Sequence, residues 1–389
     1  MANLNFPLLL LWCRQKNKTE SLFKVCLAFA IAALLKTDSN ASQLSYYQDN
    51  IVKIGLLIPD NKSVAARQGA EIAIREANAK GGLDGMPFQL VTRSMEGPWG
   101  TGSKEAVNLI FEDKVWAILG SHNGRNAHLA EQVAAKAHVV FLSAWAGDPT
   151  LSLAFIPWYF SCIPNDLQQA DALIEEIYIE RRINKTAVVN GNDYDSKLSS
   201  ETFLKKIKLA GKTDPLLFSF GNSSQDFNAL LDNISRADVK CIVLFGQPAA
   251  SLKIIRQITQ RKMKQPVFGS IQLLNENELS FQELLEYNNV ILVPSGSWPP
   301  SENSSFSHEF QKAYKRMPGA VASYSYDGMN LLIKAIMEAG APDREKIQKA
   351  LENIHYEGVT GSIRFDDKGN RAGNFKVTVI KNGLPAPIE

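Results

Sequence analysis

The chain has 389 residues, a length that suggests about two domains, and its 45% hydrophobic and 21% charged residues are the balance of a globular protein with a full core. Lys and Arg number 42 against 40 Asp and Glu, so the formal net charge is only +2. No basic run is long enough to build the clustered positive face that nucleic-acid binding needs, so we expect no nucleic-acid partner.

The N-terminal residues 1–41 have the layout of a secretory signal peptide. Basic residues up to Lys24 precede the apolar run 25–35, and small residues follow it, with cleavage expected after Ala41. The apolar run is too short for a helix that crosses a hydrocarbon core of ~30 Å, which argues against a membrane anchor. We therefore predict a cleaved signal peptide and export of the mature chain.

Two cysteines remain after the signal peptide is removed. Cys13 and Cys26 belong to the leader, whereas Cys162 and Cys241 lie in the mature chain. Export permits a disulfide bond, but we expect two separate buried thiols.

Short apolar strands alternate with amphipathic helices in the first part of the mature chain. Ser63 is expected to cap the first helix, and Gly81 with Gly82 to end it. The predicted strands cover 51–58, 88–92, 115–119 and 139–142, and the predicted helices cover 63–79, 103–112 and 126–137.

A second alternating set follows, with strands at 186–189, 216–220, 241–245, 266–269 and 289–293 and helices at 166–181, 197–209, 225–234 and 249–261. Three more helices are predicted at 307–315, 324–339 and 344–353. The tail changes character: 362–365 and 374–381 alternate apolar and polar residues around Asp366–Asn370, which predicts a hairpin. Continuous apolar strands between helices predict two parallel sheets covered on both faces, with ligands bound beyond the carboxyl ends of the strands.

Motifs for catalysis, metals and phosphate loops are missing from the sequence. The five histidines are scattered, with no zinc spacing, and no phosphate-binding glycine loop occurs. The segment Gly120-Ser121-His122-Asn123-Gly124 differs from a nucleophile elbow because its serine follows the first glycine directly. We predict no catalytic residue, no metal and no cofactor, and only His122 keeps an enzyme hypothesis open.

Several passages, in order along the chain, resemble the type I periplasmic binding proteins, and within them the leucine/isoleucine/valine-binding branch. They are GAEIA to NAKGG (69–82), AILGS (117–121), FLSA to Pro149, YSYDG (324–328) and GSIRFDDKGN (361–370). The resemblance implies an α/β fold of two doubly wound parallel-sheet lobes joined by three hinge crossovers. It places lobe 1 at 50–163 and 294–356, and lobe 2 at 164–293 and 357–389.

The resemblance also implies a function. A protein of this kind is the periplasmic solute-binding component of an ABC transporter, in which two lobes close over a small-molecule ligand and deliver it to a membrane permease. We expect a monomer. The alternative is a ligand-sensing receptor domain that reports to a signalling partner on the same fold.

The first predicted contacts follow the strand that ends near Leu119. Ser121, His122 and Asn123 lead into a helix, whose unpaired backbone N–H groups and dipole suit a ligand carboxylate. The alternative is a plain capping loop. Pro59–Lys62 is shorter than the equivalent loop of the family, so no contact is carried over to it.

The resemblance places the remaining predicted contacts at Ser143, Ala144, Trp145, Tyr194, Gln247 and Gln272. Trp145 either stacks on a planar ligand or only packs between helices. Tyr194 matches a tyrosine that covers the ligand from lobe 2. Gln272 stands where the family has the carboxylate that binds an ammonium group, and a glutamine cannot neutralise that charge. We therefore expect a small carboxylate or amide, aromatic or not, rather than a plain α-amino acid.

Overall fold

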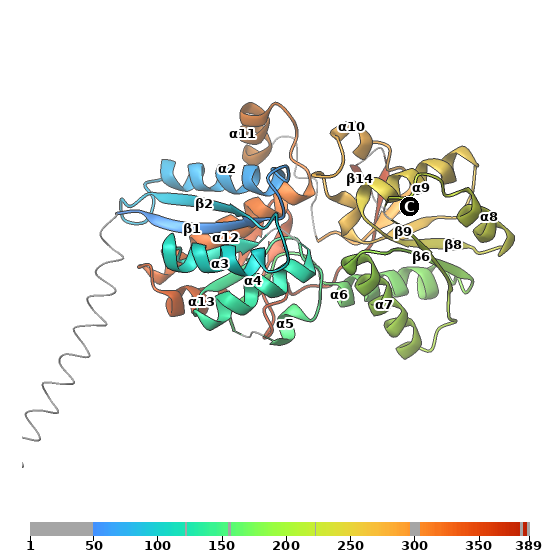
Figure 1. Ribbon diagram of the computed structural model, residues 1–389, viewed down its shortest axis with the longest axis horizontal. Coiled ribbons are helices and arrows are strands. Elements are labelled where there is room, and N and C mark those ends of the chain that lie inside the picture. The colour runs from blue at the N-terminus through green and yellow to red at the C-terminus, as the bar shows by residue number, and fades with distance from the viewer. Residues whose placement is uncertain are drawn as a thin grey trace, which may run out of the picture. The chain divides into compact units, whose positions relative to one another are not determined.

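The computed structural model, drawn in Figure 1, describes residues 50–120, 123–154, 157–221, 223–295, 304–381 and 384–386. The predicted signal peptide lies outside these residues. Val52–Glu389 forms one unit by its internal contacts. None of the helices in the described ranges is long and apolar enough to span a bilayer.

The first sheet has five parallel strands in the order β2-β1-β3-β4-β5. Its central strands are buried on both faces, which explains their continuous apolar sequences. The strands are β1 (Val52–Ile58), β2 (Phe88–Ser94), β3 (Ala117–Gly120), β4 (Val140–Ser143) and β5 (Tyr159–Ser161). Their connecting helices are α2 (Ala65–Ala79), α3 (Thr101–Val107), the π-helix η2 (Asn108–Glu112), α4 (Gly124–Lys136) and α5 (Leu151–Ala154).

The second sheet repeats this winding and adds an antiparallel edge. Its order is β14-β13-β10-β9-β8-β6-β7, in which β6 to β10 are parallel and β13 and β14 antiparallel. The strands are β6 (Thr186–Gly191), β7 (Leu216–Phe220), β8 (Cys241–Phe245), β9 (Val267–Gly269), β10 (Val290–Leu292), β13 (Thr378–Lys381) and β14 (Leu384–Ala386). The helices are α6 (Asp166–Ile174), the π-helix η3 (Glu175–Glu180), α7 (Tyr194–Leu209), α8 (Asn228–Arg236), α9 (Pro248–Gln260), the 3-10 helix η4 (Ile271–Leu274) and α10 (Phe281–Leu284).

Helices cover both faces of the first sheet, as the sequence predicted for a doubly wound fold. Figure 1 shows α2 on one side of β1 and β2, with α3 and α4 on the other. The 20-residue helix α12 (Ala320–Ala339) is buried over most of its length and packs on α2. Gly69 of α2 allows this close approach, because a Cβ atom there would lie 2.1 Å from the carbonyl oxygen of Ala322. The helices α11 (Ser305–Tyr314) and α13 (Arg344–Glu352) flank α12 in sequence.

The C-terminal tail forms only the part of the predicted hairpin that lies next to its turn. The turn at Asp366–Asn370 is present, with Gly369 at a φ of +76° and Gly369 N donating to Asp366 O at 3.0 Å. The flanking strands, however, take other partners. β12 (Gly361–Ile363) pairs with β11 (Tyr356–Gly358), and β13 pairs with β10 and β14. The prediction is confirmed next to the turn, where Phe365 and Arg371 form an antiparallel bridge and Ala372 N donates to Arg364 O at 2.8 Å. Farther from the turn it was wrong, because a local alternating pattern does not say which strand is the partner.

Two further sequence expectations have clear outcomes. Cys162 and Cys241 are both buried and free, as expected, since one follows β5 in the first sheet and the other begins β8 in the second.

Ser63 does not cap α2. Val64 is the N-cap residue and makes no side-chain bond to the helix.

Segments far apart in sequence meet around the buried guanidinium of Arg371. Its Nη1 donates to Cys162 O at 2.8 Å, just past β5, and its Nη2 donates to Thr360 O at 2.8 Å. The Asp327 carboxylate of α12 in turn accepts Thr360 N at 2.8 Å. We propose that this network lies at the hinge, where two of the predicted lobe boundaries, 163/164 and 356/357, come together.

Candidate functional site

A cavity of about 250 Å³ lies at the carboxyl ends of strands from both sheets. One side is lined by residues that follow β1 (59–63), by Asn123 after β3 and by Trp145 after β4. The other side is lined by Asp195 after β6, Gln247 after β8 and residues 272, 275, 277 and 278 after β9. Open parallel sheets bind ligands beyond these strand ends, so this cavity is the candidate site.

Side chains that follow β9 contact two helix N-termini on the opposite side of the cleft. Asn277 Oδ1 accepts Ala65 N at 3.0 Å, at the start of α2. The two carboxylate oxygens of Glu276 accept Val321 N and Ala322 N, each at 2.8 Å, at the start of α12. Neither helix has a side-chain cap of its own. Since the first N–H groups of a helix have no partner within it, these distant side chains supply the missing acceptors.

Asp195 makes a similar contact at the start of α4. Its Oδ1 accepts Gly124 N at 2.9 Å. Burial raises the pKa of the Asp195 carboxyl to about 7, against the lowering effect of the Gly124 N–H and with further repulsion from Asp193 and Asp148. A carboxylate of the protein itself therefore occupies the helix N-terminus where the sequence placed a ligand carboxylate.

A second titratable carboxyl lines the cavity at Glu278. Burial raises its pKa to about 7, and nearby Asp193 and Asp60 raise it further, although a hydrogen bond from Ala249 N acts in the opposite direction. The repulsion from these acids disfavours a further negative charge beside Glu278.

Next to the cavity, Asp148 is the acceptor of a buried hydrogen-bond cluster. It accepts from His128 Nε2 at 3.1 Å, Thr150 N at 2.8 Å and Tyr194 OH at 3.0 Å. Burial opposes ionisation of Asp148, yet the bonds from His128 and Thr150 outweigh it and hold the pKa of its carboxyl below the ordinary value. The Tyr194 hydroxyl thus joins the segment after β6 to the segment after β4.

Four of the residues predicted from sequence line the cavity: Asn123, Trp145, Gln247 and Gln272. Asn123 is also the N-cap of α4, and its side chain accepts Asn126 N at 3.0 Å. The residue therefore both caps the helix and lines the cavity. Gln272 Nε2 donates to Trp145 O at 3.1 Å across the cleft. Gln247 Nε2 donates to Asp193 Oδ1 at 2.9 Å.

The other five predicted residues are placed differently. Ser121 and His122 lie outside the described residues. Ser143 and Ala144 are fully buried beneath the cavity, where Ser143 Oγ accepts Ala146 N at 3.1 Å and Ala144 N donates to Gly120 O at 2.7 Å. Tyr194 is 41% exposed and does not line this cavity, because its hydroxyl is directed to Asp148.

Sequence reasoning missed the acidic lining. Gln272 does stand after β9 and lines the cavity, but Asp60, Asp195 and Glu278, which were not predicted, line it as well. The predicted strand 186–189 stopped short of the observed end at Gly191, and the helix was expected at 197 rather than Tyr194. With the correct boundaries, Asp195 would have been recognised directly beyond a strand end.

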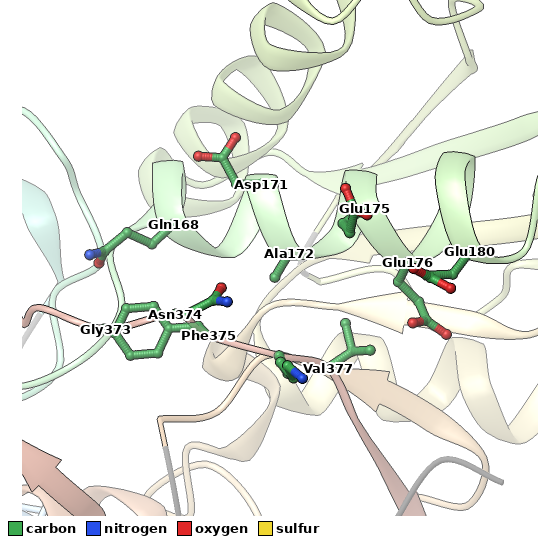
Figure 2. Close-up of a pocket in the computed structure, with 11 residues that line it drawn as sticks. Gln168, Asp171, Ala172, Glu175, Glu176, Glu180, Gly373, Asn374, Phe375 and Val377 are labelled. Atoms are coloured by element: carbon green, nitrogen blue, oxygen red, sulfur yellow. The ribbon is translucent and has the colours of Figure 1, made fainter.

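A larger hollow of about 900 Å³ lies elsewhere, along α6, η3 and residues 373–377. Figure 2 shows its acidic side chains on the helical side, opposite Phe375 and Val377. Two of these acids are paired, Asp171 with Lys206 Nζ at 2.5 Å and Glu176 with Arg181 Nε at 2.7 Å. It shares no lining residue with the cleft and does not lie at strand carboxyl ends, so we do not place the solute there.

Metal chemistry has no evident place in the described part of the chain, where no group of three or more His, Cys, Asp or Glu side chains could hold an ion.

Known proteins share this architecture over almost the whole described chain. A family model for periplasmic binding proteins matches residues 52–382. Leu/Ile/Val-binding protein homolog 1 of Brucella abortus is 25% identical over 349 residues, which cover 88% of this chain and 91% of that protein.

Two solved structures illustrate the range of ligands on this fold. LivJ of Streptococcus pneumoniae, a branched-chain amino acid transporter substrate binding protein in complex with isoleucine, has a TM-score of 0.74 and 22% identity, and the match covers 87% of this chain and 98% of that one. A solute binding protein of an ABC transporter from R. palustris, in complex with benzoate, has a TM-score of 0.72 and 20% identity, covering 86% and 95%. At these identities the likeness establishes the fold alone.

Proposed function

The chain belongs to the periplasmic binding protein family, and we propose that it is the exported solute-binding component of an ABC-type uptake system. Members of this family are solute-binding proteins rather than enzymes. The observation that carries the proposal is the cavity lined by strand ends of both sheets. A solute that contacts both sides of the cavity stabilises the closed arrangement, in which the two sides lie next to each other. This shift of the conformational equilibrium is how a two-lobe protein closes over its ligand.

The size and lining of the cavity support a small polar solute. Its volume of about 250 Å³ is below the ~300–1,000 Å³ typical of sites for drug-sized ligands. Amide side chains supply half of the polar side chains in the lining, from Asn123, Gln247, Gln272, Asn275 and Asn277. Of the two solute classes expected from the sequence, a carboxylate or an amide, this lining favours an amide, and the Trp145 indole can accommodate an aromatic one.

Transport also needs a location and a partner. We propose that residues 1–41 direct export to the periplasm and that the mature chain works as a monomer with a membrane permease. A receptor role, the alternative left by the sequence, uses the same cleft with a different partner. A permease gene beside the gene of this chain supports uptake, whereas a sensor kinase gene supports signalling.

The experiment that tests solute binding is a thermal-shift screen of the mature chain, followed by calorimetric titration of each hit. The panel contains leucine, isoleucine, benzoate, benzamide, ureas, small amines and sugars. A solute at a hundred times its Kd stabilises the folded chain by about 2.7 kcal/mol. We expect a single-site titration for at least one class, and no binding in any class would overturn the proposed function.

A matched pair of variants tests the location of the site. Gln247 lines the cavity at the N-cap of α9, whereas Gln260 is the exposed last residue of the same helix. We expect Gln247→Ala to weaken solute binding about tenfold, since one hydrogen bond to the solute is lost and Asp193 loses one of its donors. Gln260→Ala is expected to bind as the unchanged protein does. Equal affinities in the two variants would place the solute elsewhere.

A further inference from the structure

Acidic side chains outnumber basic ones around the cavity. Asp60, Asp195 and Glu278 reach it from three separate segments, and Lys62, which is exposed, is the basic residue among those that line it. Asp60 Oδ1 already accepts the backbone N–H groups of Lys62 at 2.8 Å and Ser63 at 2.9 Å. Asp195 and Glu278, the two acids on the second-sheet side, therefore have little positive charge near them in the lining.

Asp195 also fills the position best suited to an anion. The N-terminus of α4 favours negative charge, and Asp195 Oδ1 accepts Gly124 N there at 2.9 Å. The space is small as well, because a Cβ atom on Gly124 would lie 3.1 Å from the same oxygen and 2.6 Å from Asp148 Cβ. A solute carboxylate would have to displace Asp195 and would meet its charge.

The carboxylates retain capacity for a donor from a solute. A carboxylate has about four lone-pair positions, so the bonds from Gly124 N to Asp195 and from Ala249 N to Glu278 leave room for further donors. Burial and the neighbouring acids Asp193, Asp148 and Asp60 raise the pKa of both carboxyls to about 7. A cation placed between them would favour their ionised forms and release protons on binding.

Trp145 provides the second, independent sign of a missing ligand group. It is 3% exposed, lines the cavity, and its indole N–H has no hydrogen-bond partner among the described residues. A buried donor left unsatisfied is destabilising, and an acceptor oxygen of a solute would satisfy it. The indole face also attracts organic cations.

We propose that the cleft binds a small organic cation, an amine, amidine or guanidine that also carries a neutral acceptor or aromatic group, and that this solute needs no free carboxylate. Asp195 and Glu278 bind the positive group, and Trp145 forms the wall beside it. The inference rests on the proposed solute-binding function and changes its ligand class from a neutral amide to a cation, because Asp195 and Glu278 line the cavity beside the amide side chains.

The test compares solutes of one shape and different charge by calorimetric titration at pH 7. One series is benzamidine, benzamide and benzoate, and the other is leucinamide, leucine and 4-methylpentanoate. We expect the cation of at least one series to bind ten times or more tighter than its anion. Tighter binding of the anion, or binding of sugars or other uncharged solutes alone, would overturn this inference and leave solute binding intact. No binding by any solute of the wider panel would overturn both proposals.

Variants of the two acids locate the positive group. Asp195→Asn and Glu278→Gln are each expected to weaken cation binding about tenfold while the chain stays folded by circular dichroism. Asp226→Asn is the matched control, because Asp226 also accepts a backbone N–H, from Asn228 at 2.8 Å, but lies outside the cavity. Asp195→Ala should in addition strengthen carboxylate binding, since it opens the α4 N-terminus. Unchanged cation affinity in both acid variants would refute the assignment.

A further readout distinguishes direct charge contact from a structural role. Titration of the cation in buffers of different ionisation enthalpy should reveal proton release near pH 7 in the unchanged chain. The release should shrink in Asp195→Asn and Glu278→Gln and persist in Asp226→Asn. Proton uptake, or no proton exchange in the unchanged chain, would contradict the proposal.

Discussion

Replacing Glu276 with alanine removes both side-chain acceptors at the N-terminus of α12. The carboxylate of Glu276 accepts Val321 N and Ala322 N, each at 2.8 Å. The helix begins after Gly319, which supplies no side-chain cap, and is buried along most of its length. A cap supplied by the helix itself is therefore not available to compensate.

The size of the effect follows from these two bonds. Loss of a helix cap costs about 0.5–2 kcal/mol, and a buried N–H group left without a partner costs about 1–3 kcal/mol. Burial raises the pKa of the Glu276 carboxyl, so its removal also relieves the cost of burying a charge. Balancing these effects, we expect Glu276→Ala to lower the free energy of unfolding by about 2–4 kcal/mol.

Urea denaturation followed by circular dichroism measures this loss. Glu276→Gln, which keeps one carbonyl acceptor, should fall between the alanine variant and the unchanged chain. Glu309→Ala is the control, because Glu309 lies exposed on α11 with only a 3.9 Å ion pair to Lys312, and it should change stability by less than about 0.5 kcal/mol. A Glu276→Ala variant as stable as Glu309→Ala would refute the reasoning that a residue beyond β9 caps α12.

Two further predictions concern the packing and titration of the first sheet's helices. Gly69→Ala should lower the free energy of unfolding by about 1–3 kcal/mol, since the added Cβ would lie 2.1 Å from Ala322 O. Gly102→Ala in α3 should be neutral or stabilising, since the atom nearest to its Cβ is the flexible Met95 Sδ at 3.2 Å. Thermal melts of both variants measure the difference. Glu131 is fully buried, and neither carboxylate oxygen has a hydrogen-bond partner among the described residues, although His128 Nδ1 lies 4.0 Å from Oε2. Burial raises the pKa of its carboxyl to about 9. Because the folded state then holds a proton that the unfolded state has lost, the free energy of unfolding should fall as pH rises from about 5 to about 9, by up to about 1.4 kcal/mol per pH unit. Glu131→Gln should flatten this dependence. Parallel curves of stability against pH for the variant and the unchanged chain would contradict the buried-acid interpretation.

The regular elements could be predicted because their signals are local. The inner strands of a doubly wound sheet are buried on both faces, and so β3, β4 and β8 appear as continuous apolar runs. Gly81 and Gly82, both with positive φ, end α2 where glycine was expected to end it. The short strand β5 was missed because three residues give too little pattern to recognise.

The candidate site could be predicted in part for the same reason. Residues just beyond strand ends are recognised once the strands are, and this places Asn123, Trp145, Gln247 and Gln272 in one region. The acidic residues of the region were not predicted. Glu278 lies several residues past β9 in an irregular segment, so no periodic pattern assigns it to the cleft.

The alternation of apolar strands and amphipathic helices depends on neighbours a few residues apart. By itself it predicted two parallel α/β layers, with a ligand site expected at their strand ends. The tertiary structure alone decided which side chain completes which helix. Ala65 takes its acceptor from Asn277, 212 residues away, and Gly124 takes its acceptor from Asp195, 71 residues away. The physical reason is that a helix N-terminus requires an acceptor but does not specify where in the chain it comes from, so the cleft's partners and its charge appear only when both sheets are brought together.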